Sequence, residues 1–119
     1  MKLTRSFTNA FGGIKYCWRN EQNFRIHLGI TSAVIVLSIL FHISKIEWLF
    51  VMGSCALVLV TETFNTALEK LCDIITKEFH PPIKIIKDVA AGAVLLSAIG
   101  SAVTGCIIFI PKIISEVVR

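Results

Sequence analysis

Three acids and one amide in the stretch ETFNTALEKLCD are the side chains of this sequence best suited to chemistry. In a helix, Glu62, Asn65, Glu69 and Asp73 share one face within an arc of roughly 80° and extend over about 16 Å. The stretch follows the apolar run Trp48–Val60 without a proline, so we expect one continuous helix through both. An acid inside a membrane is costly, which makes each intramembrane acid a candidate for function.

The depth of these acids suggests what they do. Measured from Trp48, an expected anchor at the outer interface, Glu62 lies about 21 Å along the helix and Asp73 about 38 Å. Because the hydrocarbon core is about 30 Å thick, we expect Glu62 within the cytoplasmic leaflet and Asp73 in the cytosol. Carboxylates beside an amide also suit Mg²⁺. These features favour phosphoryl transfer from Mg-ATP to a lipid hydroxyl, with Glu62 as the general base.

Two other classes of function remain compatible with the same acidic face. It could line the pore of an ion or proton channel, or belong to a structural or regulatory membrane subunit. Soluble kinase folds are excluded, because no Walker A motif, Gly-rich kinase loop or HRD/DFG set is present. The net charge of +4 does not indicate nucleic-acid binding, since interleaved aromatics on a soluble domain are missing. The four cysteines show no metal-binding spacing.

Composition places the chain in a membrane. Of its 119 residues, 55% are hydrophobic and 17% charged, which is far from the profile of a soluble domain. Basic residues cluster before the first apolar run and between the second and third. By the positive-inside rule these regions are cytoplasmic, which puts the N-terminus inside and the C-terminus outside.

The expected fold is an all-α integral membrane domain over residues 1–119. A basic, amphipathic region at 1–27 should lie in the membrane interface. Three spans are expected at about 28–43, 46–76 and 88–110, and the last is rich in small residues that allow close helix packing. We expect a polar turn at Arg19–Arg25, a minimal outer loop at Ser44–Glu47, a loop with a helix breaker at Lys77–Lys87, and a helix end at Pro111.

The acidic stretch resembles the signature E-x-x-N-[ST]-A-[ILV]-E-x-x-x-D of the prokaryotic diacylglycerol kinase family, which includes undecaprenol kinases. Asn20-Glu21, Phe24-Arg25 and the run KDVAAGAV from Lys87 also match its pattern, with His80 before that run in the expected place. The likeness covers nearly the whole chain, and four separated motifs in the right order make it specific.

The resemblance implies roles for individual residues. Glu62 matches the catalytic base, while Glu21 and Glu69 match the carboxylates that bind the Mg²⁺ on the nucleotide. Residues that hold ATP or order the site are matched by Asn65, Asp73, His80, Lys87 and Asp88, and Arg25 is assigned to substrate binding or to ordering the site. The resemblance also implies a homotrimer with shared active sites in the bacterial cytoplasmic membrane.

The substrate is the point on which the sequence departs from part of the family. The segment Phe24-Arg25-Ile26-His27-Leu28 resembles the form in undecaprenol kinases of Gram-positive bacteria. Diacylglycerol kinases of enteric bacteria carry a glutamate where His27 stands. The sequence therefore favours undecaprenol as the acceptor, with diacylglycerol as the alternative.

Overall fold

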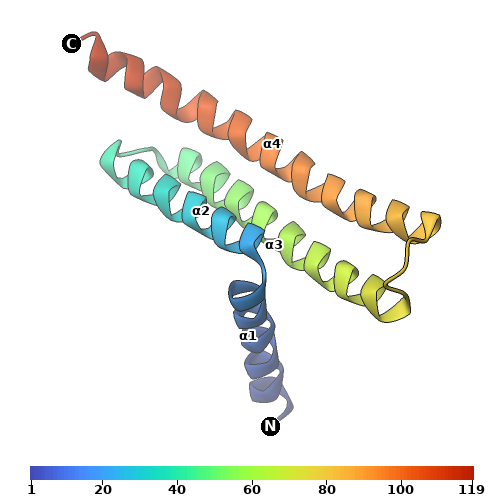
Figure 1. Ribbon diagram of the computed structural model, residues 1–119. Helices are drawn as coiled ribbons and strands as arrows, with labels where there is room; N and C mark the ends of the chain where they lie inside the picture. Colours follow the sequence, from blue (N-terminus) through green and yellow to red (C-terminus); the bar gives the residue numbers. More distant parts are fainter.

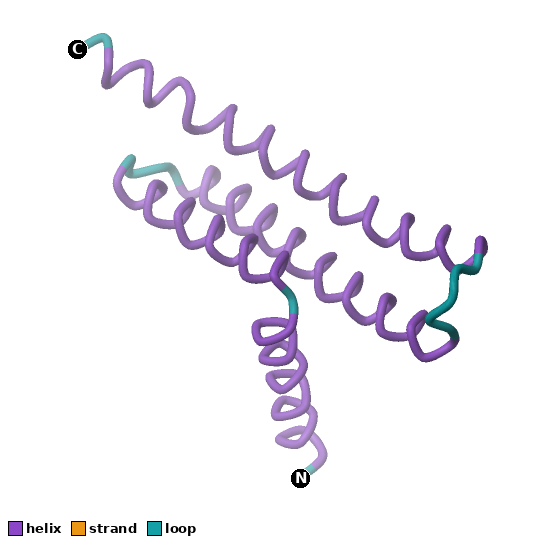
Figure 2. The backbone as a smooth tube through the Cα atoms, in the orientation of Figure 1, coloured by secondary structure: helices purple, strands orange, loops and turns teal.

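The computed structural model describes all 119 residues and contains four helices joined by short segments (Figures 1 and 2). They are α1 (Lys2–Asn20), α2 (Gln22–Leu40), α3 (Lys45–Ile75) and α4 (Pro81–Val117). All but α1 are long and apolar enough to cross a membrane. The all-helical class expected from the sequence is therefore confirmed, and so is the presence of three helices that could span a bilayer.

A break of one residue separates α1 from α2. Glu21 is extended, with φ −116° and ψ 111°, and α2 begins directly after it. The expected polar turn over Arg19–Arg25 is therefore wrong. The helices can follow each other this closely because Arg25, in the first turn of α2, caps the end of α1. Its Nη1 donates to the carbonyls of Trp18 (2.8 Å) and Arg19 (3.2 Å), which have no partner within α1.

The turn between α2 and α3 lies earlier than expected. The chain leaves α2 after Leu40, and the hydroxyl of Ser44 accepts from the N–H of Glu47 while the Glu47 carboxylate accepts from the N–H of Ser44. This reciprocal capping box starts α3 at Lys45. The expected outer loop at Ser44–Glu47 is thus wrong, since Lys45–Glu47 form the first turn of α3.

Prolines do not bound α4 as the sequence suggested. Pro81 and Pro82 occupy its first turn, where a missing N–H costs nothing, so the loop before it is shorter than Lys77–Lys87. Pro111 does not end the helix, which continues to Val117. The segment after Pro111 is held by an ion pair of 3.2 Å between Lys112 Nζ and Glu47 in the first turn of α3.

Helix α3 is the centre of the molecule. Helices α2 and α4 both pack on α3, and α1 lies at a steep angle to the bundle and contacts α2 and α3 (Figure 1). A small core (Ile43, Val51, Cys55, Ile108, Phe109) joins the turn after α2 to α3 and α4 at one end. Only 15 of 119 residues are buried, so apolar side chains along every helix face outward. A single chain leaves these faces to lipid or to other protein.

Candidate functional site

Glu62 is the most buried charged residue of the chain, with 2% of its surface exposed. It lies on α3 among residues of α1 and α2. Within the fold, the one side-chain hydrogen bond that reaches this residue is from the Thr66 hydroxyl to its backbone carbonyl, at 3.0 Å. The carboxylate itself has no hydrogen-bond donor from the protein, which leaves it free to accept a proton or a hydrogen bond from a substrate.

Asn65 lies one turn further along α3 and is also buried, with 7% exposed. Its Nδ2 donates to Glu69 Oε1 at 3.3 Å, so the amide orients one of the acids on the same face. Its Oδ1 is buried without any hydrogen-bond partner. A buried, unpaired acceptor costs free energy of about 1–3 kcal/mol, and such an atom in a native site calls for a donor or a cation.

Glu21 reaches the acidic face from the break between α1 and α2. It is half-buried, and its charge acts on both Glu62 and the Cys17 thiol. Glu69 acts on Glu62 as well. Glu21 therefore influences an acid of α3 electrostatically, although the two residues are far apart in the sequence.

The acids and bases at the far end of α3 are exposed and paired. Lys87 Nζ on α4 contacts Asp73 Oδ1 on α3 at 2.8 Å, and Asp88 pairs with Lys84 one turn away on α4. His80 precedes α4, and its exposed side chain makes no capping bond. Arg25, assigned to substrate binding or site ordering, holds the end of α1. The structure thus pairs Asn65 with Glu69 and Asp73 with Lys87, while Arg25 bonds to α1 and Asp88 to Lys84.

Several residues of the site have no obvious signal in the sequence. Cys17 is buried between α1 and α3 and interacts with Thr66. Burial raises the pKa of this thiol above its ordinary value, so it is neutral near pH 7. The ammonium of Lys70 lies 5.0 Å from the centre of the Tyr16 ring, a second tie between α1 and α3. These contacts depend on how α1 turns back, which periodicity alone does not determine.

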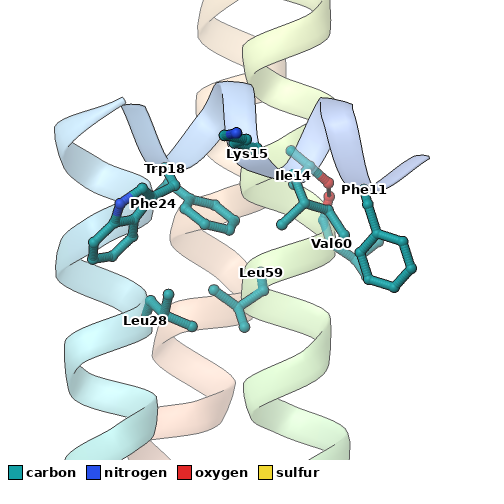
Figure 3. Close-up of a pocket in the computed structure, with 9 residues that line it drawn as sticks. Phe11, Ile14, Lys15, Trp18, Phe24, Leu28, Leu59 and Val60 are labelled. Carbon is teal, nitrogen blue, oxygen red and sulfur yellow. Dashed lines mark hydrogen bonds between the residues drawn. The ribbon is translucent and has the colours of Figure 1, made fainter. Parts of the chain in front are cut away.

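An apolar groove opens between α1, α2 and α3 (Figure 3). Its volume is about 520 Å³, and seven of its nine lining residues are hydrophobic. Phe11, Trp18 and Phe24 point into it from α1 and α2, facing Leu59 of α3. Thr63, the residue after Glu62, also lines the groove. Glu62 itself does not line the groove, which reaches the acidic helix at the preceding turn and at Thr63.

The polar residues fit a divalent cation of the magnesium type. Carboxylate oxygens and an amide oxygen are the ligands that Mg²⁺ prefers, and it keeps several water or phosphate ligands. Glu69 and the orphaned Oδ1 of Asn65 lie on one helix face. No group of three or more His, Cys, Asp or Glu side chains is placed to enclose an ion. The arrangement therefore suits a cation that arrives with a phosphate rather than one held by protein alone.

The chain is similar over most of its length to proteins named as lipid kinases. Residues 8–109 match the family model described as prokaryotic diacylglycerol kinase. The undecaprenol kinase of Bacillus subtilis (strain 168) is 38% identical over 94% of this chain and 91% of its own length. The diacylglycerol kinase of Synechocystis is also 38% identical, over 98% of this chain and 67% of its own length. The diacylglycerol kinase of Escherichia coli (strain K12) is 29% identical over 90% of this chain.

The exposed pair Asp73–Lys87 should contribute little to stability. Pairs of this exposure typically contribute below about 1 kcal/mol, so Asp73→Asn and Lys87→Met should each leave the free energy of unfolding within about 1 kcal/mol of the wild type. Unfolding in detergent by denaturant, with the double variant to complete the cycle, measures the coupling between the two residues. A coupling above about 2 kcal/mol would contradict this account and make the pair a structural clamp between α3 and α4.

Proposed function

The chain belongs to the prokaryotic diacylglycerol kinase family and is a membrane lipid kinase, and we propose that it transfers the γ-phosphate of ATP to undecaprenol. The observation that carries the proposal is the buried carboxylate of Glu62 beside Thr63, which lines the apolar groove. The lipid chain lies in the groove and its hydroxyl reaches Glu62. The channel and structural functions compatible with the acidic face have no comparable support.

In the proposed reaction Glu62 accepts the proton of the lipid hydroxyl. The hydroxyl oxygen attacks the γ-phosphorus, the bond from that phosphorus to the β–γ bridging oxygen breaks, and ADP leaves. Mg²⁺, when bound with ATP, neutralises the phosphate charge. Burial of Glu62 keeps water from the carboxylate, and the lack of any protein donor leaves its lone pairs for the lipid hydroxyl.

Glu21 and Glu69 are proposed to hold the cation on the nucleotide. Asn65 supports this role, because its Nδ2 orients Glu69 while its Oδ1 remains available to a ligand. We assign Asp73, His80, Lys87 and Asp88 to ATP, at the exposed end of the acidic face. Arg25 orders the site through its bonds to the end of α1.

The lining of the groove favours undecaprenol over diacylglycerol. Diacylglycerol carries two ester groups near its hydroxyl, and their carbonyl oxygens need donors once they leave water. The lining offers few donors to them, because the Thr63 hydroxyl already donates to the carbonyl of Val60 and only Lys15 and the indole N–H of Trp18 remain. A polyprenol has one hydroxyl on an unbroken hydrocarbon chain and makes no such demand. The names of the relatives support both lipids, so the argument rests on the groove.

We further propose a homotrimer in the bacterial cytoplasmic membrane, with the N-terminus inside and α1 lying in the interface. The buried acid and the outward apolar faces support assembly, because lipid cannot pair the polar groups of the acidic face. Helix α1 has aromatic side chains on its apolar stripe and lysines and arginines beside them. This pattern supports the proposed position of α1 in the membrane interface. In such a trimer, residues of a neighbouring subunit would cover the part of the acidic face that a single chain leaves exposed.

The acceptor lipid is tested by phosphorylation of undecaprenol and diacylglycerol in parallel, with the purified chain in detergent and radiolabelled ATP. We expect kcat/KM for undecaprenol to be at least about tenfold higher, because a largely hydrocarbon groove suits an unbroken hydrocarbon chain better than two ester groups. Leu59→Trp, which fills the groove, should raise KM for the lipid and leave KM for ATP unchanged. The matched control is Leu57→Trp, at an outward-facing position of the same helix outside the groove. A higher kcat/KM for diacylglycerol would overturn the assignment of undecaprenol as the substrate. Label in neither lipid would overturn the proposed kinase activity.

The cation site is tested by the dependence of activity on Mg²⁺ concentration at fixed ATP. Glu21→Gln and Glu69→Gln should each raise the Mg²⁺ concentration for half-maximal activity about tenfold or more, since each removes an anionic ligand. Glu116→Gln, an exposed acid near the C-terminus, serves as the control with unchanged Mg²⁺ dependence. If both variants lose turnover while their Mg²⁺ dependence stays that of the wild type, these acids do not hold the cation.

A further inference from the structure

A second pocket lies between α1 and α3 and continues the line of the apolar groove along α3. Its volume is about 400 Å³. On α3 the lining of the groove ends at Thr63, and the lining of this α1–α3 pocket runs from Thr63 to Lys70. Ile14 of α1 also lines both cavities (Figure 3). The groove and the α1–α3 pocket therefore adjoin, and the pocket is the one nearer the end of α3 that we assign to the cytosol.

The α1–α3 pocket carries a cation that the fold holds in place. The ammonium of Lys70 lies 5.0 Å from the centre of the Tyr16 ring, and both residues line the pocket. Lys84, Lys87 and Lys112 are each paired with an acid, whereas no carboxylate lies within ion-pair distance of Lys70. Lys70 is therefore a positioned cation whose charge is available to an anion.

The acids of α3 face away from this pocket. Lys70 directly follows Glu69, so the two side chains point about 100° apart around the helix axis. Lys70 lies instead on the side of Thr63 and Thr66, and no acid lines the pocket. Because side chains in a helix tilt towards its N-terminal end, the Lys70 side chain leans towards the turn of Thr66. An anion in the pocket would thus lie beside a positive charge and off the acidic face.

The remaining lining indicates which kind of anion fits. Ile14, Ala67 and other small or apolar residues form most of the wall, so the pocket offers hydrocarbon contact together with one charge. A free phosphate ion would gain nothing from the apolar wall. A phosphate monoester on a hydrocarbon chain uses both features, and it carries between one and two negative charges near pH 7. Lys70 is exposed, so the phosphate could also keep part of its hydration.

We propose that the α1–α3 pocket binds the phosphate monoester of the lipid product, with Lys70 as its counter-charge. The inference rests on the function proposed above, which places the lipid alcohol in the adjoining groove. Phosphorylation turns a neutral hydroxyl into an anion that apolar surroundings do not stabilise. Movement of the headgroup from Thr63 to Lys70, about 10 Å along α3, brings that anion to a cation and leaves the acidic face free for the next alcohol.

Binding of farnesyl phosphate to the purified chain in detergent, without ATP, tests the inference. Isothermal titration calorimetry measures the Kd, with farnesol as the uncharged probe and inorganic phosphate as a competitor. We expect Lys70→Met to raise the Kd for farnesyl phosphate about fivefold or more and to leave the Kd for farnesol within about twofold, because only the monoester uses the charge. Lys70→Arg should retain binding within about twofold. Lys77→Met is the matched control, since it removes an exposed, unpaired lysine near the same end of α3 and outside the pocket.

Four outcomes would overturn the inference. They are an unchanged Kd for farnesyl phosphate in Lys70→Met, an equal loss in Lys77→Met, a loss in Lys15→Met without one in Lys70→Met, and competition by inorganic phosphate as strong as that by farnesyl phosphate. The third would place the phosphate in the groove, which Lys15 lines, and the fourth would indicate a site for free phosphate.

Phosphorylation of undecaprenol by the same wild-type preparation is measured beside the titrations. Binding requires no turnover, so the two measurements fail separately. Binding that depends on Lys70 in an inactive preparation would overturn the proposed function and leave a site for a lipid phosphate. Full activity without such binding would overturn the inference and leave the proposed function.

Discussion

The desolvation of one carboxylate is the constraint on which the rest of the structure depends. Glu62 is almost completely buried in a helix apolar enough to cross a membrane. A charged group there is costly unless it is compensated, which makes a buried acid in a membrane span a candidate for function. The neighbours of Glu62 can be understood from this requirement. Asn65 and Glu69 continue its face towards water, while the groove on the other side of Thr63 offers a dry path for a hydrocarbon chain.

The break at Glu21 sets the direction of α1 relative to α2 and α3. An uninterrupted helix through α1 and α2 would carry Glu21 away from α3. The extended residue at this position lets α1 turn back, and Arg25 stabilises the turn by bonding the last carbonyls of α1. The buried Cys17 and the Lys70–Tyr16 contact then hold α1 against α3. If α1 lies in the membrane interface as proposed, the break at Glu21 joins the interfacial helix to the first span.

Helical periodicity was enough to predict the acidic face, because residues at steps of three, four and four fall on one side of any helix. The helix ends were harder to predict. Pro111 was expected to end α4, yet the helix continues and Lys112 pairs with Glu47 of α3. A loop was expected at Ser44–Glu47, whereas a capping box between Ser44 and Glu47 starts α3 at Lys45. The neighbours of Glu62 could not be predicted either, since they depend on how α1 and α2 pack.

The central claim is that Glu62 acts on the lipid hydroxyl and not on the nucleotide. The most direct test compares Glu62→Gln with the wild type in two measurements on the same preparation: turnover of lipid phosphorylation and the affinity for Mg-ATP. The account predicts a loss of turnover of about 10²–10⁴-fold, the usual contribution of a general base, with nucleotide affinity within about threefold. Turnover within a few-fold of the wild type, or a loss of nucleotide binding equal to the loss of turnover, would contradict it.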